Sequence, residues 1–210
     1  MKPYYDQDGI TIYHGDCREI LPHVTADVLI TDPPYGIAFE SGWTGASIVG
    51  DDTTDARDVV LSMCPDLPAA VFGAAGEATL PNAVAALVWH RPGSGMGDLA
   101  FPWKPDYELV HVFGAGWSHA ARGSSVLSFP WDDFRGRLAH PHQKPQKLMR
   151  HLIERAPAGV ILDPFAGSGS TLRAAKDLGR KAIGIEIEER YCEIAAMRLG
   201  QMVFDLESAA

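Results

Sequence analysis

The sequence predicts an α/β fold in which helices cover both faces of a mostly parallel, doubly wound sheet. Short apolar runs rich in Val, Ile and Leu alternate with segments of helical periodicity along the 210 residues. Two of these runs end in a proline-containing turn, at residues 32–35 and 163–165. Ligands bind to open α/β sheets at such carboxyl ends of strands. A chain of this length is expected to bury one core, so we predict a single domain over residues 1–210.

Each expected element follows from a local pattern. Seven apolar runs have the length and composition of strands: 10–14, 27–31, 69–73, 85–90, 107–113, 160–163 and 182–187, with a short further candidate at 125–129. Helical periodicity predicts helices at 56–64, 145–156, 170–178 and 188–204. Pro145 suits the first turn of its helix, and Gly179 suits the end of the next one. Residues 36–55 and 114–143 are polar, Gly-containing stretches that resist assignment.

The composition excludes several classes of protein. Hydrophobic residues make up 46% and charged residues 21%, which is typical of a globular protein in water. No apolar stretch approaches the ~20 residues of a membrane span, and the N-terminus lacks the apolar core of a signal peptide. Cys17, Cys64 and Cys192 are scattered, without the spacing of a metal site. They argue against a zinc site or disulfide framework and favour the reducing cytoplasm.

Charge is distributed unevenly along the chain. The net charge is −9, which by itself disfavours a nucleic-acid partner. Residues 91–155, however, contain 9 Lys and Arg against 6 Asp and Glu, and five of the 8 histidines. The middle third is therefore the candidate face for a polyanion, although an excess of this size is also common on solvated surfaces.

The first candidate site follows the apolar run 27–31. Asp32 offers a carboxylate, Pro33 a backbone carbonyl and Tyr35 an aromatic ring, and the prolines at 33 and 34 make the turn stiff. Two acceptors beside a stacking face suit a planar ring that bears an exocyclic NH2 group, such as adenine or cytosine. The alternative is a rigid strand-to-loop turn without chemistry.

The second candidate site is the Gly-rich turn after the run 160–163. Gly167 and Gly169 allow a tight turn and close approach of a ligand, and Ser170 or Thr171 could cap the following helix. The turn lacks the Lys of a P-loop and the third glycine of the dinucleotide fingerprint, so a nucleoside-like ligand fits better than ATP or NAD. Glu186 ends the next strand 23 residues after Asp163, where an acidic residue can accept both ribose hydroxyls.

Together these motifs resemble those of S-adenosylmethionine-dependent DNA amino-methyltransferases. Residues 31–36 precede residues 163–171, an order similar to that of the circularly permuted β group of the family. The runs 140–145 and 15–17 are further matches, although family members usually have Thr where this chain has His142. The resemblance covers nearly the whole chain. It implies a Rossmann-like methyltransferase fold with a seven-stranded, mostly parallel sheet that contains one antiparallel strand, in a single catalytic domain.

The resemblance also implies roles for the matched residues. Asp32, Pro33, Pro34 and Tyr35 would form the catalytic turn. S-adenosylmethionine is the implied methyl donor, with no metal: Asp163, Phe165, Gly167 and Gly169 would line its methionine end, and Lys144 would fix its carboxylate. Glu186 would hold the ribose, and Asp16 with Cys17 would meet the adenine. The full implied donor set is Asp16, Cys17, Thr31, Lys144, Asp163, Phe165, Gly167, Gly169, Ser170, Thr171 and Glu186.

The implied substrate is a base flipped out of double-stranded DNA. Asp32 favours adenine N6, because cytosine-N4 members of the family more often carry Ser at this position. Two alternatives remain: a methyltransferase that acts on RNA or on a protein amide, and a silent module that binds donor or DNA without catalysis. No cysteine has the context of a covalent intermediate.

Target recognition is expected in the short segment 114–140. Arg side chains can read guanine and aromatic rings can stack or wedge between bases, although an ordinary surface loop has the same residues. So short a segment indicates a short site, relaxed specificity, or a partner subunit, such as the second copy of a homodimer, that completes the DNA cleft. The expected DNA contacts, including one in the earlier loop, are Trp43, Arg122, Trp131, Arg135 and Arg137.

Overall fold

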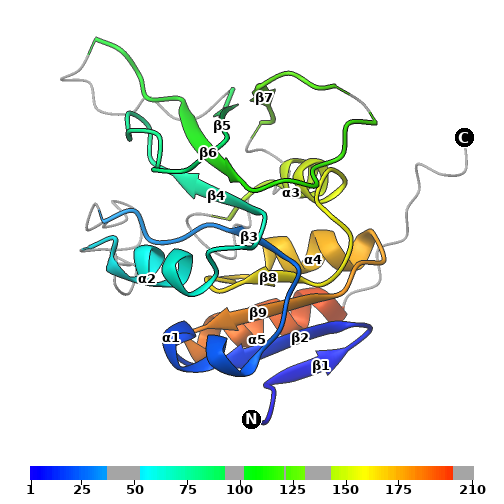
Figure 1. Cartoon of the computed structure of the whole chain (residues 1–210). Coiled ribbons are helices and arrows are strands. Elements are labelled where there is room, and N and C mark those ends of the chain that lie inside the picture. Colours follow the sequence, from blue (N-terminus) through cyan, green and yellow to red (C-terminus); the bar gives the residue numbers. More distant parts are fainter. Residues whose placement is uncertain (37–52, 93–101, 121, 131–142, 201–210) are drawn as a thin grey trace, which may run out of the picture.

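The computed structural model describes residues 1–36, 53–92, 102–120, 122–130 and 143–200. Within these residues, nine strands form one mixed sheet in the order β1-β2-β9-β8-β3-β4-β6-β5-β7 (Figure 1). The strands are β1 (Tyr5–Gln7), β2 (Ile10–His14), β3 (Val28–Thr31), β4 (Ala69–Gly73), β5 (Ala85–His90), β6 (Tyr107–Phe113), β7 (Val126–Ser128), β8 (Ile161–Asp163) and β9 (Ala182–Glu186). The helices are α1 (Cys17–Ile20), followed by a 3-10 turn (Leu21–His23), α2 (Asp55–Met63), α3 (Gln146–Ile153), α4 (Ser170–Asp177) and α5 (Glu189–Gly200).

The sheet has two strands more than the seven that we predicted. All seven are present, and β1 and β7 extend the two edges; β7 is the short candidate at 125–129 and pairs parallel with β5. β1 and β6 both run antiparallel to their neighbours, so two strands are reversed instead of one. β1 arises from a tight turn at Asp8 and Gly9, whose φ angles of 52° and 78° match the type I′ hairpin turn that an Asp-Gly pair favours.

The helix starts differ in detail from those predicted. Pro145 lies immediately before α3 and not in its first turn, and Gly169 is the N-cap residue of α4. Ser170 and Thr171 therefore lie inside α4 and do not cap it. The short helix α1 was not predicted, although Asp16 caps it by accepting a hydrogen bond from the Arg18 backbone N–H at 2.9 Å. Residues 201–204, the predicted end of the last helix, lie outside the described residues.

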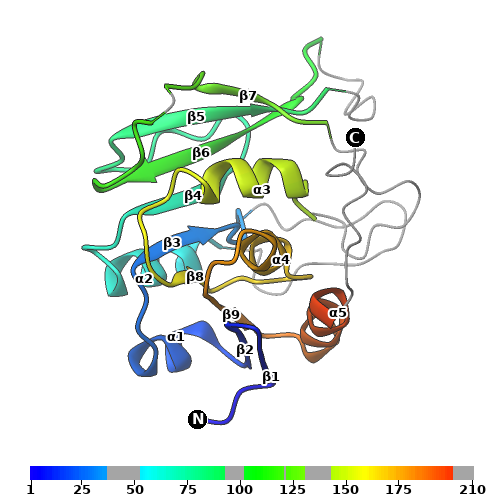
Figure 2. The same ribbon diagram turned by 90° about the vertical axis from the view of Figure 1, so that its right-hand side faces the viewer.

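Two hydrophobic cores lie on opposite faces of the sheet, as Figure 2 shows for the helices that cover them. Successive side chains of β3 point to opposite faces, so Val28 and Ile30 join the core under α3, α4 and α5, whereas Leu29 joins the core under α1 and α2.

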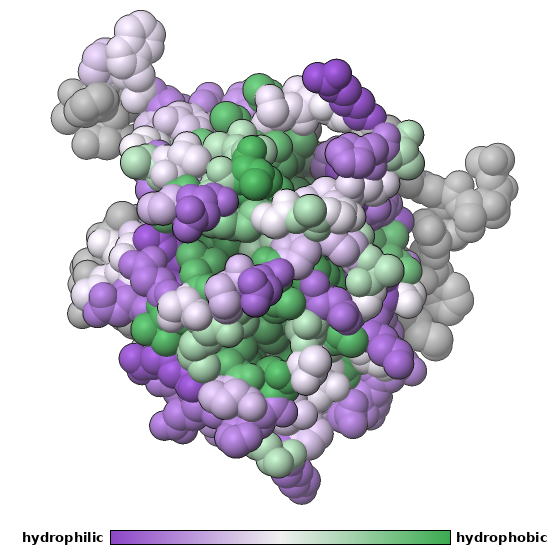
Figure 3. Space-filling view, in the orientation of Figure 1, coloured by the Kyte–Doolittle hydropathy of each residue, from purple (hydrophilic) through white to green (hydrophobic). Residues whose placement is uncertain are grey.

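Figure 3 shows hydrophobic side chains in a hollow at the middle of one molecular face, framed by hydrophilic ones.

The topology places the two motif turns side by side. β3 and β8 are parallel neighbours, with Leu29 opposite Leu162, and β9 is the next strand after β8. Because parallel strands end at the same edge of a sheet, the turns after β3, β8 and β9 share that edge. The residues of both predicted motifs therefore converge, although about 130 residues separate them in the sequence.

Candidate active site

A buried hydrogen bond joins the two motifs. The Thr31 hydroxyl, at the end of β3, donates to Asp163 Oδ1, at the end of β8, over 2.7 Å. Both residues are buried, with 1% and 2% of their surface exposed. The Phe165 backbone N–H also donates to Asp163 Oδ1, at 3.2 Å, and so closes the Gly-rich turn onto the same carboxylate. The turn after β3 is thus fixed directly against the turn after β8.

Asp32 is held by two donors from different parts of the chain. Lys144 Nζ donates to Asp32 Oδ2 at 2.6 Å, and the Tyr35 hydroxyl donates to Asp32 Oδ1 at 2.6 Å. Lys144 directly precedes Pro145 and α3, and its side chain is 5% exposed. The resemblance implies that Lys144 fixes the donor carboxylate; in the structure its ammonium lies against the turn after β3, among carboxylates of the chain itself.

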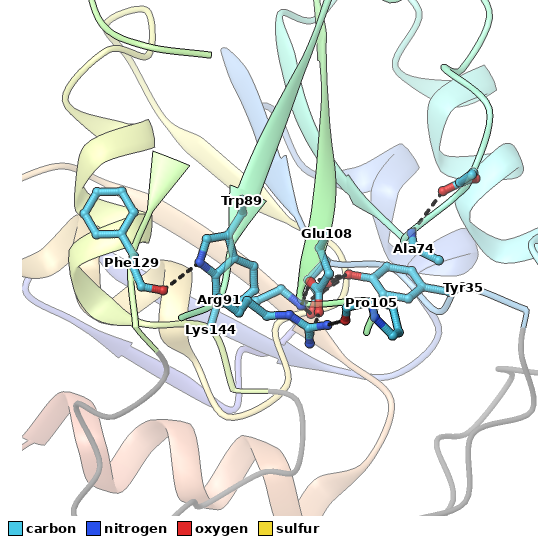
Figure 4. Close-up of polar contacts among 10 residues, drawn as sticks. Tyr35, Ala74, Trp89, Arg91, Pro105, Glu108, Phe129 and Lys144 are labelled. Carbon is cyan, nitrogen blue, oxygen red and sulfur yellow. Dashed lines mark hydrogen bonds and ion pairs between the residues drawn. The ribbon is translucent and has the colours of Figure 1, made fainter. Parts of the chain in front are cut away.

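A second carboxylate, which sequence reasoning missed, completes this cluster. Glu108 in β6 places Oε2 at 3.0 Å from Lys144 Nζ and at 3.2 Å from the Tyr35 hydroxyl. Its other oxygen, Oε1, accepts a hydrogen bond at 3.1 Å from Arg91, which follows β5 (Figure 4). Glu108 is only 6% exposed. The available signal was the one carboxylate within a mostly apolar strand, because buried charges are rarely kept without a partner.

Aromatic rings enclose the Lys144 ammonium. Nζ lies 4.9 Å from the ring centroid of Phe72, 5.6 Å from that of Tyr35 and 5.7 Å from that of Trp89. The Trp89 ring is itself fixed, because its Nε1–H donates to the Phe129 carbonyl at 2.9 Å. The three rings, together with the carboxylates of Asp32 and Glu108, form an environment that favours a cationic nitrogen.

The environment fixes the protonation of the two donors. Burial disfavours the charged form of Lys144, but Asp32 and Glu108 outweigh that cost and raise its pKa. Burial raises the pKa of Tyr35 well above its ordinary value, and the same two carboxylates raise it further. At neutral pH Lys144 is therefore an ammonium and Tyr35 a phenol, so both act as donors.

The Gly-rich turn brings a further pair of carboxylates together. Burial raises the pKa of Asp163 to about 6, even though hydrogen bonds from Thr171, Thr31 and Phe165 oppose the shift. Glu186 at the end of β9 accepts the Gly167 N–H on Oε2 and the Glu188 N–H on Oε1, each at 2.8 Å. Burial also raises the pKa of Glu186, against these hydrogen bonds.

The two glycines of the turn have different surroundings. A Cβ atom at Gly167, where φ is +50°, would meet nothing within 4 Å, so the turn leaves open space there. A Cβ atom at Gly169, where φ is +79°, would lie 2.9 Å from the Ala195 Cβ atom of α5. Gly167 therefore leaves room for a ligand, whereas Gly169 allows α4 and α5 to pack closely.

Other predicted donor contacts have structural tasks as well. Besides capping α1, the Asp16 carboxylate pairs with the Arg18 guanidinium, whose hydrogen bond lowers the pKa of Asp16. Cys17 is 7% exposed and belongs to the core under α1 and α2, and burial raises the pKa of its thiol to about 11. Ser170 and Thr171 are buried in the first turn of α4.

Of the predicted DNA contacts, only Arg122 lies within the described residues, where it is exposed. Trp43, Trp131, Arg135 and Arg137 lie outside them. The described part of the chain contains no cluster of three His, Cys, Asp or Glu side chains that could hold a metal ion. In the same residues, no helix has the length and apolar character needed to cross a membrane.

Comparisons with known proteins assign the family. Residues 108–197 match the model of the DNA methylase family. The type II methyltransferase M2.LlaDCHI of Lactococcus lactis subsp. cremoris is 38% identical over 256 residues, which cover 95% of this chain and 93% of that protein. The chain belongs to the S-adenosylmethionine-dependent DNA amino-methyltransferases.

Solved structures show that this methyltransferase has the expected Rossmann-like fold. The M1.HpyAVI–SAM complex is 23% identical with a TM-score of 0.67, and the match covers 91% of this chain and 100% of that one. The cytosine-N4-specific PvuII DNA methyltransferase is 19% identical with a TM-score of 0.72, and the match covers 99% and 92%.

Proposed function

We propose that this methyltransferase transfers a methyl group from S-adenosylmethionine to adenine N6 of a base flipped out of double-stranded DNA. One observation carries the proposal. The Asp32 carboxylate, with its donors Lys144 and Tyr35, lies directly beside the Gly-rich turn, because Thr31 bonds to Asp163 across the two motifs. An acceptor for an amine thus adjoins a Gly-rich turn with two buried carboxylates, which suit a cationic nucleoside.

The residues of the Gly-rich turn fit the donor. S-adenosylmethionine supplies an electrophilic methyl group on a positively charged sulfur. Asp163 and Glu186 offer buried carboxylates at adjacent strand ends, and a Cβ atom at Gly167 would meet nothing within 4 Å, so a ligand can approach the backbone there. We assign the methionine end to Asp163, Phe165, Gly167 and Gly169, and the ribose to Glu186. Asp16 and Cys17 would border the adenine, Thr31 and Thr171 would support Asp163, and Ser170 would line the donor site beside them.

The chemistry follows from the catalytic turn. An exocyclic amine is a poor nucleophile, because its lone pair is delocalised into the ring. Asp32 and the Pro33 carbonyl accept its two hydrogens and favour a pyramidal nitrogen with a localised lone pair. Asp32 also stabilises the positive charge that develops on that nitrogen. Tyr35 fixes Asp32 Oδ1 and offers its ring to the base, and Pro34 stiffens the turn.

Adenine is the favoured base, and cytosine N4 is the second candidate. Asp at position 32 supports adenine through the family resemblance, whereas the structural likeness to the cytosine-N4-specific PvuII enzyme supports cytosine. Both bases present the same NH2 geometry to Asp32. A methyltransferase for RNA or a protein amide is the remaining alternative. Mass spectrometry of nucleosides from treated plasmid DNA distinguishes N6-methyladenine from N4-methylcytosine.

The proposal is tested by Asp32→Ala. We expect methyl transfer to plasmid DNA to fall by at least about a thousandfold, since one positioned electrostatic group is typically worth about 10²–10³ and Asp32 is also the amine acceptor. S-adenosylmethionine binding should persist, because the residues assigned to its methionine end and ribose follow β8 and end β9. Asp66→Ala, an exposed position far from the motifs, is the control. Near-normal turnover by Asp32→Ala would reject the assignment.

A further inference from the structure

The catalytic cluster contains more charge than the transfer reaction requires. Two carboxylates, Asp32 and Glu108, face two cations, Lys144 and Arg91, with the Tyr35 phenol between them. These five groups come from the ends of β3 and β5, from β6 and from the residue before Pro145 and α3. A single carboxylate and a carbonyl would be enough to hold the target amine.

The position of Lys144 creates a conflict. Its ammonium occupies Asp32 Oδ2 at 2.6 Å, while Tyr35 occupies Oδ1 at 2.6 Å. A target amine that binds Asp32 becomes positively charged as it is methylated, and a neighbouring ammonium opposes that charge strongly in a site shielded from water. For catalysis, the charge of Lys144 must therefore be drawn away from Asp32.

Glu108 is positioned to receive that charge. Its Oε2 already lies 3.0 Å from Lys144 Nζ, so the ammonium can pair with Glu108 alone while it stays next to the Phe72 and Trp89 rings. Arg91 binds the opposite oxygen, Oε1, at 3.1 Å and also donates to the Pro105 carbonyl at 2.9 Å. The Glu108 carboxylate is therefore held with Oε2 toward Lys144 (Figure 4).

We propose that Glu108 is a positioning residue that acts through Lys144. When the target amine binds, the Lys144 side chain shifts its ammonium from Asp32 toward the Glu108 carboxylate. The negative charge of Asp32 then faces the amine alone during the reaction. This inference rests on the proposed function and adds Glu108, as a second carboxylate, to the residues that serve it. Glu108 does not touch the base or the donor in this scheme. Its effect on turnover depends entirely on the presence of the Lys144 charge.

A double-mutant cycle tests this dependence. Glu108→Gln keeps the shape of the side chain but leaves Lys144 on Asp32, so we expect kcat on plasmid DNA to fall about tenfold or more. In the Lys144→Met background the same change should alter kcat by less than about twofold, because no ammonium remains to be moved. The kcat of Lys144→Met alone is the reference for that background, so only the ratio of kcat values within each background is compared. KM for DNA and donor affinity should stay near those of the wild type.

The controls separate this role from a structural one. Glu77→Gln removes a comparable carboxylate that pairs with Arg57 at 2.5 Å and lies 3.7 Å from His111 Nε2, and its effect should be the same with or without Lys144. Glu108→Asp, which keeps the charge, should restore part of kcat. An equal loss from Glu108→Gln in both backgrounds, no loss at all, or abolition of turnover by Lys144→Met would each overturn the inference. A wild-type chain that transfers no methyl group to DNA would instead refute the proposed function, and the inference with it.

Discussion

The burial of the Asp163 carboxyl makes the stability of the folded chain depend on pH. Burial raises its pKa to about 6 from an ordinary value of 3.8. The folded chain therefore favours the protonated carboxyl, and this contribution to stability is fully present below pH 3.8 and is lost as the pH rises through 6. Relative to Asp163→Asn, which does not titrate, the wild type should lose about 2 kcal/mol of unfolding free energy between pH 4 and pH 7.

Urea denaturation of both proteins across that pH range measures the difference. The comparison isolates Asp163, because the other titrating groups are shared and Asn can still accept the hydrogen bond from Thr31. A difference in unfolding free energy that does not change with pH would show that burial does not raise the pKa of Asp163 in the folded chain. The donor-binding proposal for this residue would then rest on its location alone.

At the scale of elements, the two glycines in the turn between β8 and α4 have different roles, one in helix packing and the other in the proposed donor site. Alanine at Gly169 meets both an unfavourable positive φ and the Ala195 side chain, whereas alanine at Gly167 meets only the former. A non-glycine residue in such a conformation costs about 1–3 kcal/mol, so both variants should lose stability, and Gly169→Ala should lose more. Donor affinity should show the opposite order, because the Cβ atom at Gly167 projects into the open space of the proposed donor site.

Thermal unfolding and S-adenosylmethionine titration of the two alanine variants check these opposed rank orders. If Gly167→Ala were the less stable protein and bound donor normally, the turn would be a packing element only. Matched variants two residues apart make this test independent of any general loss of folding, because each protein serves as the control for the other.

Sequence patterns predicted these elements where local information was sufficient. The seven internal strands follow from apolar runs, and the convergence of Asp32 and Asp163 follows from the rule that parallel strands share their carboxyl edge. The hairpin at Asp8 and Gly9 could also have been predicted, because an Asp-Gly pair favours this type of turn, although we did not predict it. Other features depend on partners that are distant in sequence and could not be read from single positions.

The cluster around Lys144 is the clearest example of such a feature. Its pairing with Asp32 spans 112 residues, and its pairing with Glu108 requires that β6 insert antiparallel beside β4. A sequence motif identifies Lys144 as a site residue but does not show which charge it meets. The role of Cys17 as a core residue was hidden for the same reason, because it depends on packing, whereas the helix cap at Asp16 is a local contact that the sequence could have indicated.

At the scale of the whole molecule, an acidic chain must bind an acidic polymer. The net charge of −9 opposes DNA, so attraction has to come from a local face, and residues 91–155 carry the excess of basic side chains. Arg122 in this segment is exposed. If it contacts a phosphate, Arg122→Gln should weaken binding uniformly across DNA sequences, because a phosphate contact carries no base information.

Salt dependence identifies that contact. Each phosphate contact contributes about 0.9 to the slope of log affinity against log salt concentration, so Arg122→Gln should make the slope shallower by about that amount. Arg190→Gln is the matched control, since this exposed arginine lies on α5, outside the basic segment, and pairs with Glu188. An equal effect of both substitutions would mean that the affinity for DNA depends only on the net charge of the protein. The basic segment would then have no special part in binding.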